Sequence, residues 1–135
     1  MSIINKVLSK VVGSRHDRVI KKFTKLVAQV NSFEKGMQAL GDDGLRAKTQ
    51  QFRERLDKEG SLEDILPEAF AVVKETARRL KENGSLTVEA TLMDKQIAAK
   101  GAHVEIKGEK ATWHNKWMAA GTEVIWDMVH YDVQL

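Results

Sequence analysis

The sequence contains no cysteine, which excludes disulfide-stapled folds and zinc sites built from thiolates. It also lacks any apolar run approaching the roughly 20 residues that a membrane-spanning helix needs. The first residues mix lysines with apolar side chains and offer no small-residue cleavage site, so we expect no secretory signal peptide. Together these absences predict a chain that works in a reducing cytoplasm.

Motifs of common catalytic and metal sites are missing too. The histidines show neither an H-E-x-x-H pattern nor any other metal-ligand spacing, and no Ser, His and Asp arrangement suggests a nucleophile. The stretch GEKAT (108–112) lacks the G-x-x-x-x-G-K-[ST] spacing with which a phosphate loop wraps its ligand, and KGEK (107–110) is typical of a hairpin turn. We therefore expect no catalytic residue and no metal within these residues.

What the sequence does contain is enough apolar material for one modest core, and an uneven distribution of charge. The chain has 135 residues, of which 42% are hydrophobic, so one domain is expected. Residues 1–30 hold seven basic side chains and one acidic one, whereas the remaining residues are slightly acidic. A basic front end indicates an anionic partner such as lipid, nucleic acid or an acidic protein surface, although a solvated helix face explains it equally well.

Residues 3–12 repeat apolar side chains at helical spacing with lysines opposite, which predicts a basic amphipathic helix. That helix could lie on a membrane or dock on its own domain. Nucleic acid is disfavoured, because no aromatic side chains are interleaved with the basic ones and Phe23 falls on an apolar face. The candidate membrane-binding residues are Lys6, Lys10, Arg15, Arg18, Lys21 and Lys22.

Three further helices are expected from periodicity. One runs from Arg15 to about Met37, with an inward face of Val19, Phe23, Leu26, Val27 and Val30. A second covers roughly 43–58 and is capped by Asp42 or Asp43. A third begins at Pro67, whose missing N–H is tolerated in a first turn, and stops at Gly84 in a left-handed conformation.

After Gly84 the apolar period changes from helical to alternating. The stretches LTVEATL (86–92), HVEIKG (103–108) and EVIW (123–126) predict strands, and MDKQIAAK (93–100) predicts a short helix. The three tryptophans are expected to form the core of this unit rather than a ligand cage. The predicted class is α+β, with about four N-terminal helices followed by a small antiparallel β unit that packs independently of them.

Four stretches stand out in the order in which they occur: GSRHDRVIKKFTKLV (13–27), DDGLRAKTQQFRERL (42–56), ILPEAFAVVKETARRL (65–80) and MVHYDVQL (128–135). Their sequence and order resemble the SecA family, the ATPase motors of bacterial preprotein translocation. The resemblance divides the chain into a helical N-terminal region (1–80), an inserted β-containing segment (81–127) and the start of the nucleotide-binding domain (128–135). Shorter family members lack the inserted segment, so it is expected to be a surface addition.

The resemblance implies that the chain is a fragment of a larger P-loop motor whose cofactor is ATP. Gln134 would read adenine, because a carboxamide offers the donor and acceptor that match the N7 and N6 atoms of the base. Met128 and Tyr131 would line the base pocket. The fragment itself would not hydrolyse ATP, since the phosphate loop is absent.

The resemblance also implies partners and a location. The partners would be the SecY channel complex, unfolded preproteins, an anionic phospholipid surface and a second copy of the chain, without any specific nucleic acid. The location would be cytoplasmic, with peripheral association at the inner face of the cell membrane. The alternative interpretation is a free-standing basic adaptor that binds anionic lipid or nucleic acid.

Overall fold

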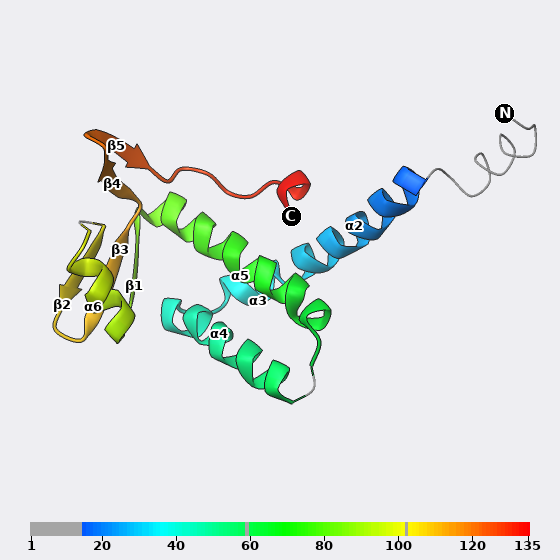
Figure 1. Cartoon of the computed structure of the whole chain (residues 1–135), viewed down its shortest axis with the longest axis horizontal. Coiled ribbons are helices and arrows are strands. Elements are labelled where there is room, and N and C mark those ends of the chain that lie inside the picture. Colours follow the sequence, from blue (N-terminus) through cyan, green and yellow to red (C-terminus); the bar gives the residue numbers. More distant parts are fainter. Residues whose placement is uncertain (1–14, 59, 102) are drawn as a thin grey trace, which may run out of the picture.

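The computed structural model describes residues 15–58, 60–101 and 103–135 (Figure 1). Four described helices precede the first strand, and small antiparallel sheets follow, so the predicted α+β class is confirmed. The predicted helix over 3–12, with Lys6 and Lys10, lies outside the described residues. The elements are α2 (Arg15–Ser32), α3 (Glu34–Gln38), α4 (Asp42–Asp57), α5 (Leu62–Asn83), β1 (Ser85–Glu89), α6 (Leu92–Ala98), β2 (Val104–Lys107), β3 (Lys110–His114), β4 (Lys116–Ala119), β5 (Thr122–Ile125) and the 3-10 turn η1 (Asp132–Gln134).

Helix α5 is the central element and begins earlier than its proline suggested. Ser61 is the N-cap, and its hydroxyl forms a reciprocal capping box with Asp64, so the prediction of a start at Pro67 is wrong. Pro67 lies inside the helix, where it leaves one carbonyl of the preceding turn without its helical partner. Gly84 ends the helix in the left-handed region with φ 72°, as predicted.

The helix expected from Arg15 to about Met37 is divided into α2 and α3. The Ser32 hydroxyl donates to the Gln29 carbonyl at 2.6 Å, and the Phe33 amide bonds Val30 three residues back at 3.1 Å. These short-range bonds compete with the regular helical pattern and end α2 at Ser32.

The helical core lies where α2, α3 and α4 meet α5. Val30, Met37, Leu45 and Ala71 are buried together there, and Leu135 packs against them from the other end of the chain. The first half of α2 extends away from this core (Figure 1). For that reason the predicted inward face is only partly correct: Val30 is buried, but 56% of Phe23 is exposed.

The β unit contains two small sheets. The first has the order β1-β3-β2 with antiparallel pairing, and Gly108, at φ 59°, forms the hairpin turn predicted at KGEK. The second is the β4–β5 hairpin. Val88, Val104 and Ala111 form the core of the first sheet, with Trp113 packed against it. Strands β3 and β4 were not separately delimited by sequence alternation.

The outer edge of β1 is covered by the start of α4. The Asp42 carboxylate accepts a hydrogen bond from the Thr87 amide at 3.2 Å, and Asp43 accepts one from the Glu89 amide at 2.7 Å. Neither aspartate caps α4, because Gly41 is the N-cap and receives no side-chain bond, so that prediction is wrong. The carboxylates instead satisfy N–H groups that an edge strand leaves unpaired.

The expectation that the β unit packs independently of the helices is also wrong. Asp94 of α6 is fully buried and accepts a hydrogen bond from Arg46 of α4 at 2.7 Å. It accepts another from the Trp113 indole at 3.1 Å and forms a capping box with Thr91. A buried charge needs such partners, so α4 completes the environment of a residue that belongs to the β unit.

Candidate functional site

The residues that follow the β unit lead back toward the helical core. Asn115 joins the two ends of the unit, since its amide donates to the Gly84 carbonyl at 2.9 Å and its carbonyl accepts from the Trp126 amide at 2.7 Å. The Asn115 side chain also donates to the Trp126 carbonyl at 3.3 Å. From there the chain runs back along α5 to the turn η1 beside α2 and α3 (Figure 1).

Gln134, the predicted adenine reader, lies at the end of that turn. Its backbone amide donates to the Tyr131 carbonyl at 2.8 Å, and its side-chain Oε1 accepts from the Tyr131 amide at 2.8 Å. A carboxamide oxygen has a second lone pair and its nitrogen has two N–H groups, so both kinds of bond to a base remain chemically possible. The glutamine side chain is therefore held by its own turn.

Side chains from three helices surround the turn. The Asn31 amide donates to Asp132 Oδ1 at 3.1 Å, and Lys74 Nζ lies 3.9 Å from the same oxygen. Lys74 also donates to Asn31 Oδ1 at 2.9 Å and forms an ion pair with Glu34. Together with the packing of Leu135, these contacts attach the turn to α2, α3 and α5.

A pocket of about 650 Å³ lies between α2 and the turn. Of the three predicted base-pocket residues, Gln134 lines it, whereas Met128 and Tyr131 do not, and 75% of Tyr131 is exposed. The wall contributed by α2 is mostly apolar and the wall contributed by the turn is mixed. The lining residues are Ile20, Phe23, Thr24, Val27, Asp132, Val133, Gln134 and Leu135.

The described basic residues of the candidate membrane surface all lie on α2. Arg15, Arg18, Lys21 and Lys22 are exposed there. None of the helices in the described ranges is long and apolar enough to traverse a bilayer. The same ranges contain no group of three acidic, histidine or cysteine side chains placed to hold a metal ion.

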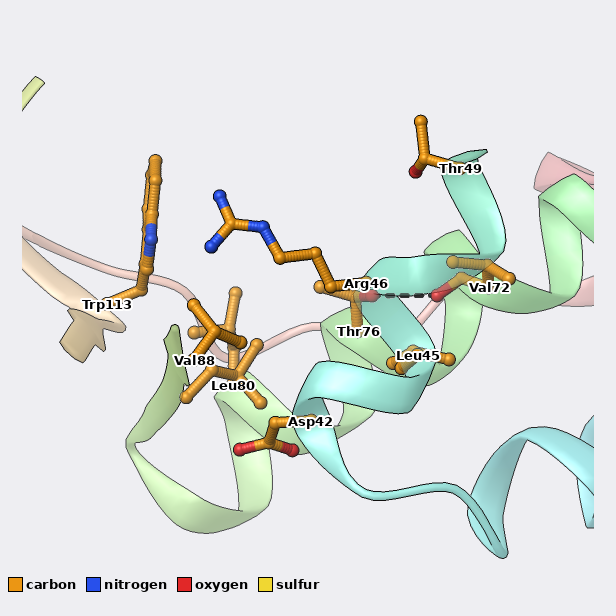
Figure 2. A pocket seen from close by; sticks show the side chains of 10 residues that line it. Asp42, Leu45, Arg46, Thr49, Val72, Thr76, Leu80, Val88 and Trp113 are labelled. Carbon is orange, nitrogen blue, oxygen red and sulfur yellow. Dashed lines mark hydrogen bonds between the residues drawn. The ribbon is translucent and has the colours of Figure 1, made fainter. Parts of the chain in front are cut away.

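A second pocket, of about 280 Å³, marks the junction between the helices and the β unit (Figure 2). Arg46 extends from α4 toward Trp113, with Val88 and Leu80 below the gap between them (Figure 2). Burial raises the pKa of the Asp94 carboxyl beside it, but hydrogen bonds from Arg46 and Thr91 outweigh burial and hold that pKa well below its usual range. The charges here are paired with each other, so the junction is a structural contact.

Sequence reasoning did not identify Asn31 and Lys74 as residues of the site. Lys74 directly follows the PEAFAVV stretch, but no local pattern connects it to Asp132, which lies 58 positions further on. These contacts depend on where the β unit returns the chain to the helices. The backbone bonds of Asn115 to Gly84 and Trp126, which bring the two ends of the β unit together, likewise could not be read from any local pattern.

Comparison with known proteins places the sequence of this chain among DEAD-like domains. The family model described as "SecA DEAD-like domain" matches residues 8–135. The protein translocase subunit SecA of Cytophaga hutchinsonii is 39% identical over 96% of this chain, and that of Flavobacterium psychrophilum is 35% identical over all of it. No solved structure matches. The chain belongs to the SecA family.

The relatives are much longer than this chain. The chain spans 16% of the length of the Cytophaga and Flavobacterium proteins. The alignment with the Flavobacterium protein extends over 178 positions, so that relative also contains residues with no counterpart among the 135 residues here.

Proposed function

We propose that this chain is the N-terminal part of an ATPase that drives preproteins through the SecY channel, and that it supplies the adenine-reading glutamine. The observation that carries the proposal is the turn of Gln134, which lines a pocket in a chain that the SecA family model matches from residue 8 to 135. The proposed division is a helical region (1–80), an insertion (81–127) and the start of the nucleotide-binding domain (128–135). Unfolded preproteins are the proposed substrate of the whole motor.

Gln134 performs recognition and no bond-breaking chemistry. Its side-chain oxygen accepts from the exocyclic amine of adenine while its amide donates to N7, a pairing that guanine cannot reproduce at the same atoms. Met128 and Tyr131 are exposed, which leaves both free to contact the base in this proposal. ATP hydrolysis belongs to the full-length protein, because these residues contain no phosphate loop.

The test is nucleotide preference in the full-length protein. We expect Gln134→Ala to reduce the preference for ATP over GTP by about tenfold, the effect of losing one bidentate base contact. The matched control is Gln96→Ala, which removes an exposed glutamine of α6. An unchanged ratio of the two KM values in Gln134→Ala would show that this residue does not read the base.

The exposed basic side chains of α2, together with Lys6 and Lys10, support association with an anionic membrane surface at the cytoplasmic side. Each basic residue near such a surface contributes about 1 kcal/mol. We expect neutralising Arg15, Arg18, Lys21 and Lys22 to reduce co-sedimentation with phosphatidylglycerol vesicles, and added salt to do the same. The charge-matched control neutralises Lys95, Lys100, Lys107 and Lys116, which are exposed on the β unit.

Equal vesicle binding by the two sets of variants would show that the basic residues of α2 do not contribute to membrane binding. Removal of residues 1–12 tests the remaining part of the predicted surface in the same assay. Contact with the SecY channel and formation of a homodimer are further parts of the proposal, and neither requires a specific nucleic acid.

A further inference from the structure

We propose that Lys74 and Asn31 are positioning residues that set the nucleobase selectivity of Gln134. The inference rests on the proposed function, because it concerns the same glutamine. Neither residue lines the pocket of Gln134. They act through Asp132, two positions before the glutamine.

Lys74 is the centre of the arrangement. Only 16% of its side chain is exposed, so its ammonium group depends on protein acceptors in place of water. Those acceptors come from three other elements: Asn31 Oδ1 of α2 at 2.9 Å, the carboxylate of Glu34 in α3, and Asp132 Oδ1 of the turn at 3.9 Å. One cation thus attracts the turn toward the helices from a fixed position on α5.

Asn31 supplies the direct bond to the turn. Its amide nitrogen donates to Asp132 Oδ1 at 3.1 Å, while its amide oxygen is occupied by Lys74. A side-chain amide with its oxygen bound to an ammonium group can present only its N–H donors to the carboxylate. Lys74 therefore orients Asn31 as well as attracting Asp132.

The position of Asp132 is transmitted to Gln134 because the turn is internally bonded. Both the backbone amide and the side-chain oxygen of Gln134 bond to Tyr131, one residue before Asp132. The three-residue turn and the glutamine side chain are thereby one unit. Loss of the Asp132 contacts lets that unit populate other orientations, and apparent affinity falls with the fraction that remains competent.

The experiment measures kcat and KM with ATP and with GTP in the full-length protein. We expect Lys74→Met and Asn31→Leu each to raise KM for ATP about three- to fivefold, with KM for GTP and both kcat values unchanged. Lys74→Arg preserves the charge and should retain the ATP preference. The matched control is Lys48→Met, which removes a similarly buried lysine whose partner is Glu68, away from the turn.

The Gln134→Ala variant separates the two proposals. If it lowers ATP preference while Lys74→Met and Asn31→Leu do not, the positioning role is overturned and the adenine reader stands. If none of the three changes the preference, the adenine reader itself fails. Adding Lys74→Met to Gln134→Ala should cause no further loss of selectivity. An equal rise in KM for both nucleotides in the single variants would indicate general distortion and would overturn the inference.

Discussion

The C-terminal part of the chain is attached to the helices at two places, and the two attachments differ in kind. At the junction of α4 with the β unit, Asp94 is fully buried and bonded to Arg46, Trp113 and Thr91. At the turn η1, the side chain of Asp132 is 64% exposed. The carboxylate of the first attachment is shielded from water, whereas that of the second remains in contact with it. The difference is one of burial: the junction is built around a buried charge, and the turn is held by an exposed one.

Buried polar groups without hydrogen-bond partners are also distributed unequally between the junction and the segment that leads to the turn. In the described ranges, two buried side-chain nitrogens have no hydrogen-bond partner, Trp126 Nε1 and His130 Nδ1. Both belong to the segment between β5 and the turn, and none belongs to the junction. Such groups reduce stability. The hydrogen-bonding groups of the segment that leads to Gln134 are therefore less completely paired than those of the junction.

The largest effect should follow from Asp94→Ala. Removing the carboxylate leaves Arg46, the Trp113 indole and the start of α6 without their shared acceptor, so we expect the free energy of unfolding to fall by about 3 kcal/mol. Urea denaturation measures the change. Glu105→Gln, at an exposed acidic position of β2, is the control and should cost less than about 0.5 kcal/mol. Similar costs for the two variants would mean that the junction contributes little.

Deletion of residues 82–126, with Asp127 joined to α5 through a short linker, should have a smaller effect. Asp43 and Arg46 then face water, Asp42 keeps its ion pair with Arg79 at 2.6 Å, and the core of Val30 and Ala71 remains. We expect the helices to retain cooperative unfolding and helical circular dichroism, with about 1–2 kcal/mol less stability. Loss of cooperativity would show that the β unit is part of the helical core.

The sequence predicted those features that depend on local chemistry. The stop of α5 at Gly84 and the turn at Gly108 were found because a positive φ favours glycine. The start of α5 is set by the capping pair of Ser61 and Asp64, whereas Pro67, which predicts a later start, is tolerated inside the helix. Gln134 was located through family resemblance rather than through any local rule.

The remaining features depend on contacts between residues far apart in the sequence. Asp42 and Asp43 resembled helix caps, yet they bond amides of β1 about 45 residues away. The environments of Asp94 and Asp132 likewise depend on α4 and on α2 with α5, respectively. No periodicity or spacing within one element could have revealed these partners, because they exist only once the β unit is docked.

Acid should weaken the junction gradually. Burial raises the pKa of the Asp94 carboxyl, but hydrogen bonds from Arg46 and Thr91 outweigh burial, so that pKa lies below its ordinary 3.8. The unfolded chain then binds more protons, so the stabilisation from Asp94 is complete above its ordinary pKa of 3.8 and is lost as the pH falls below that value. We expect urea midpoints to decrease over that range, and to decrease less in Asp94→Asn. An equal decrease in the unsubstituted protein and in Asp94→Asn would show that Asp94 does not cause the loss of stability in acid.

The smallest effect on stability should come from Gln134→Ala. The glutamine is exposed, and its side-chain bond to the Tyr131 amide joins residues only three positions apart, so water can replace it when the side chain is removed. We expect the free energy of unfolding to change by less than about 0.5 kcal/mol, measured by urea denaturation beside Asp94→Ala. A small change in the free energy of unfolding, combined with the expected loss of ATP preference, would show that this residue acts in nucleotide recognition and not in folding. A loss above about 1 kcal/mol would instead make the turn a structural clamp, because exposed positions without such a role rarely cost that much. The contrast between the two attachments would then no longer hold.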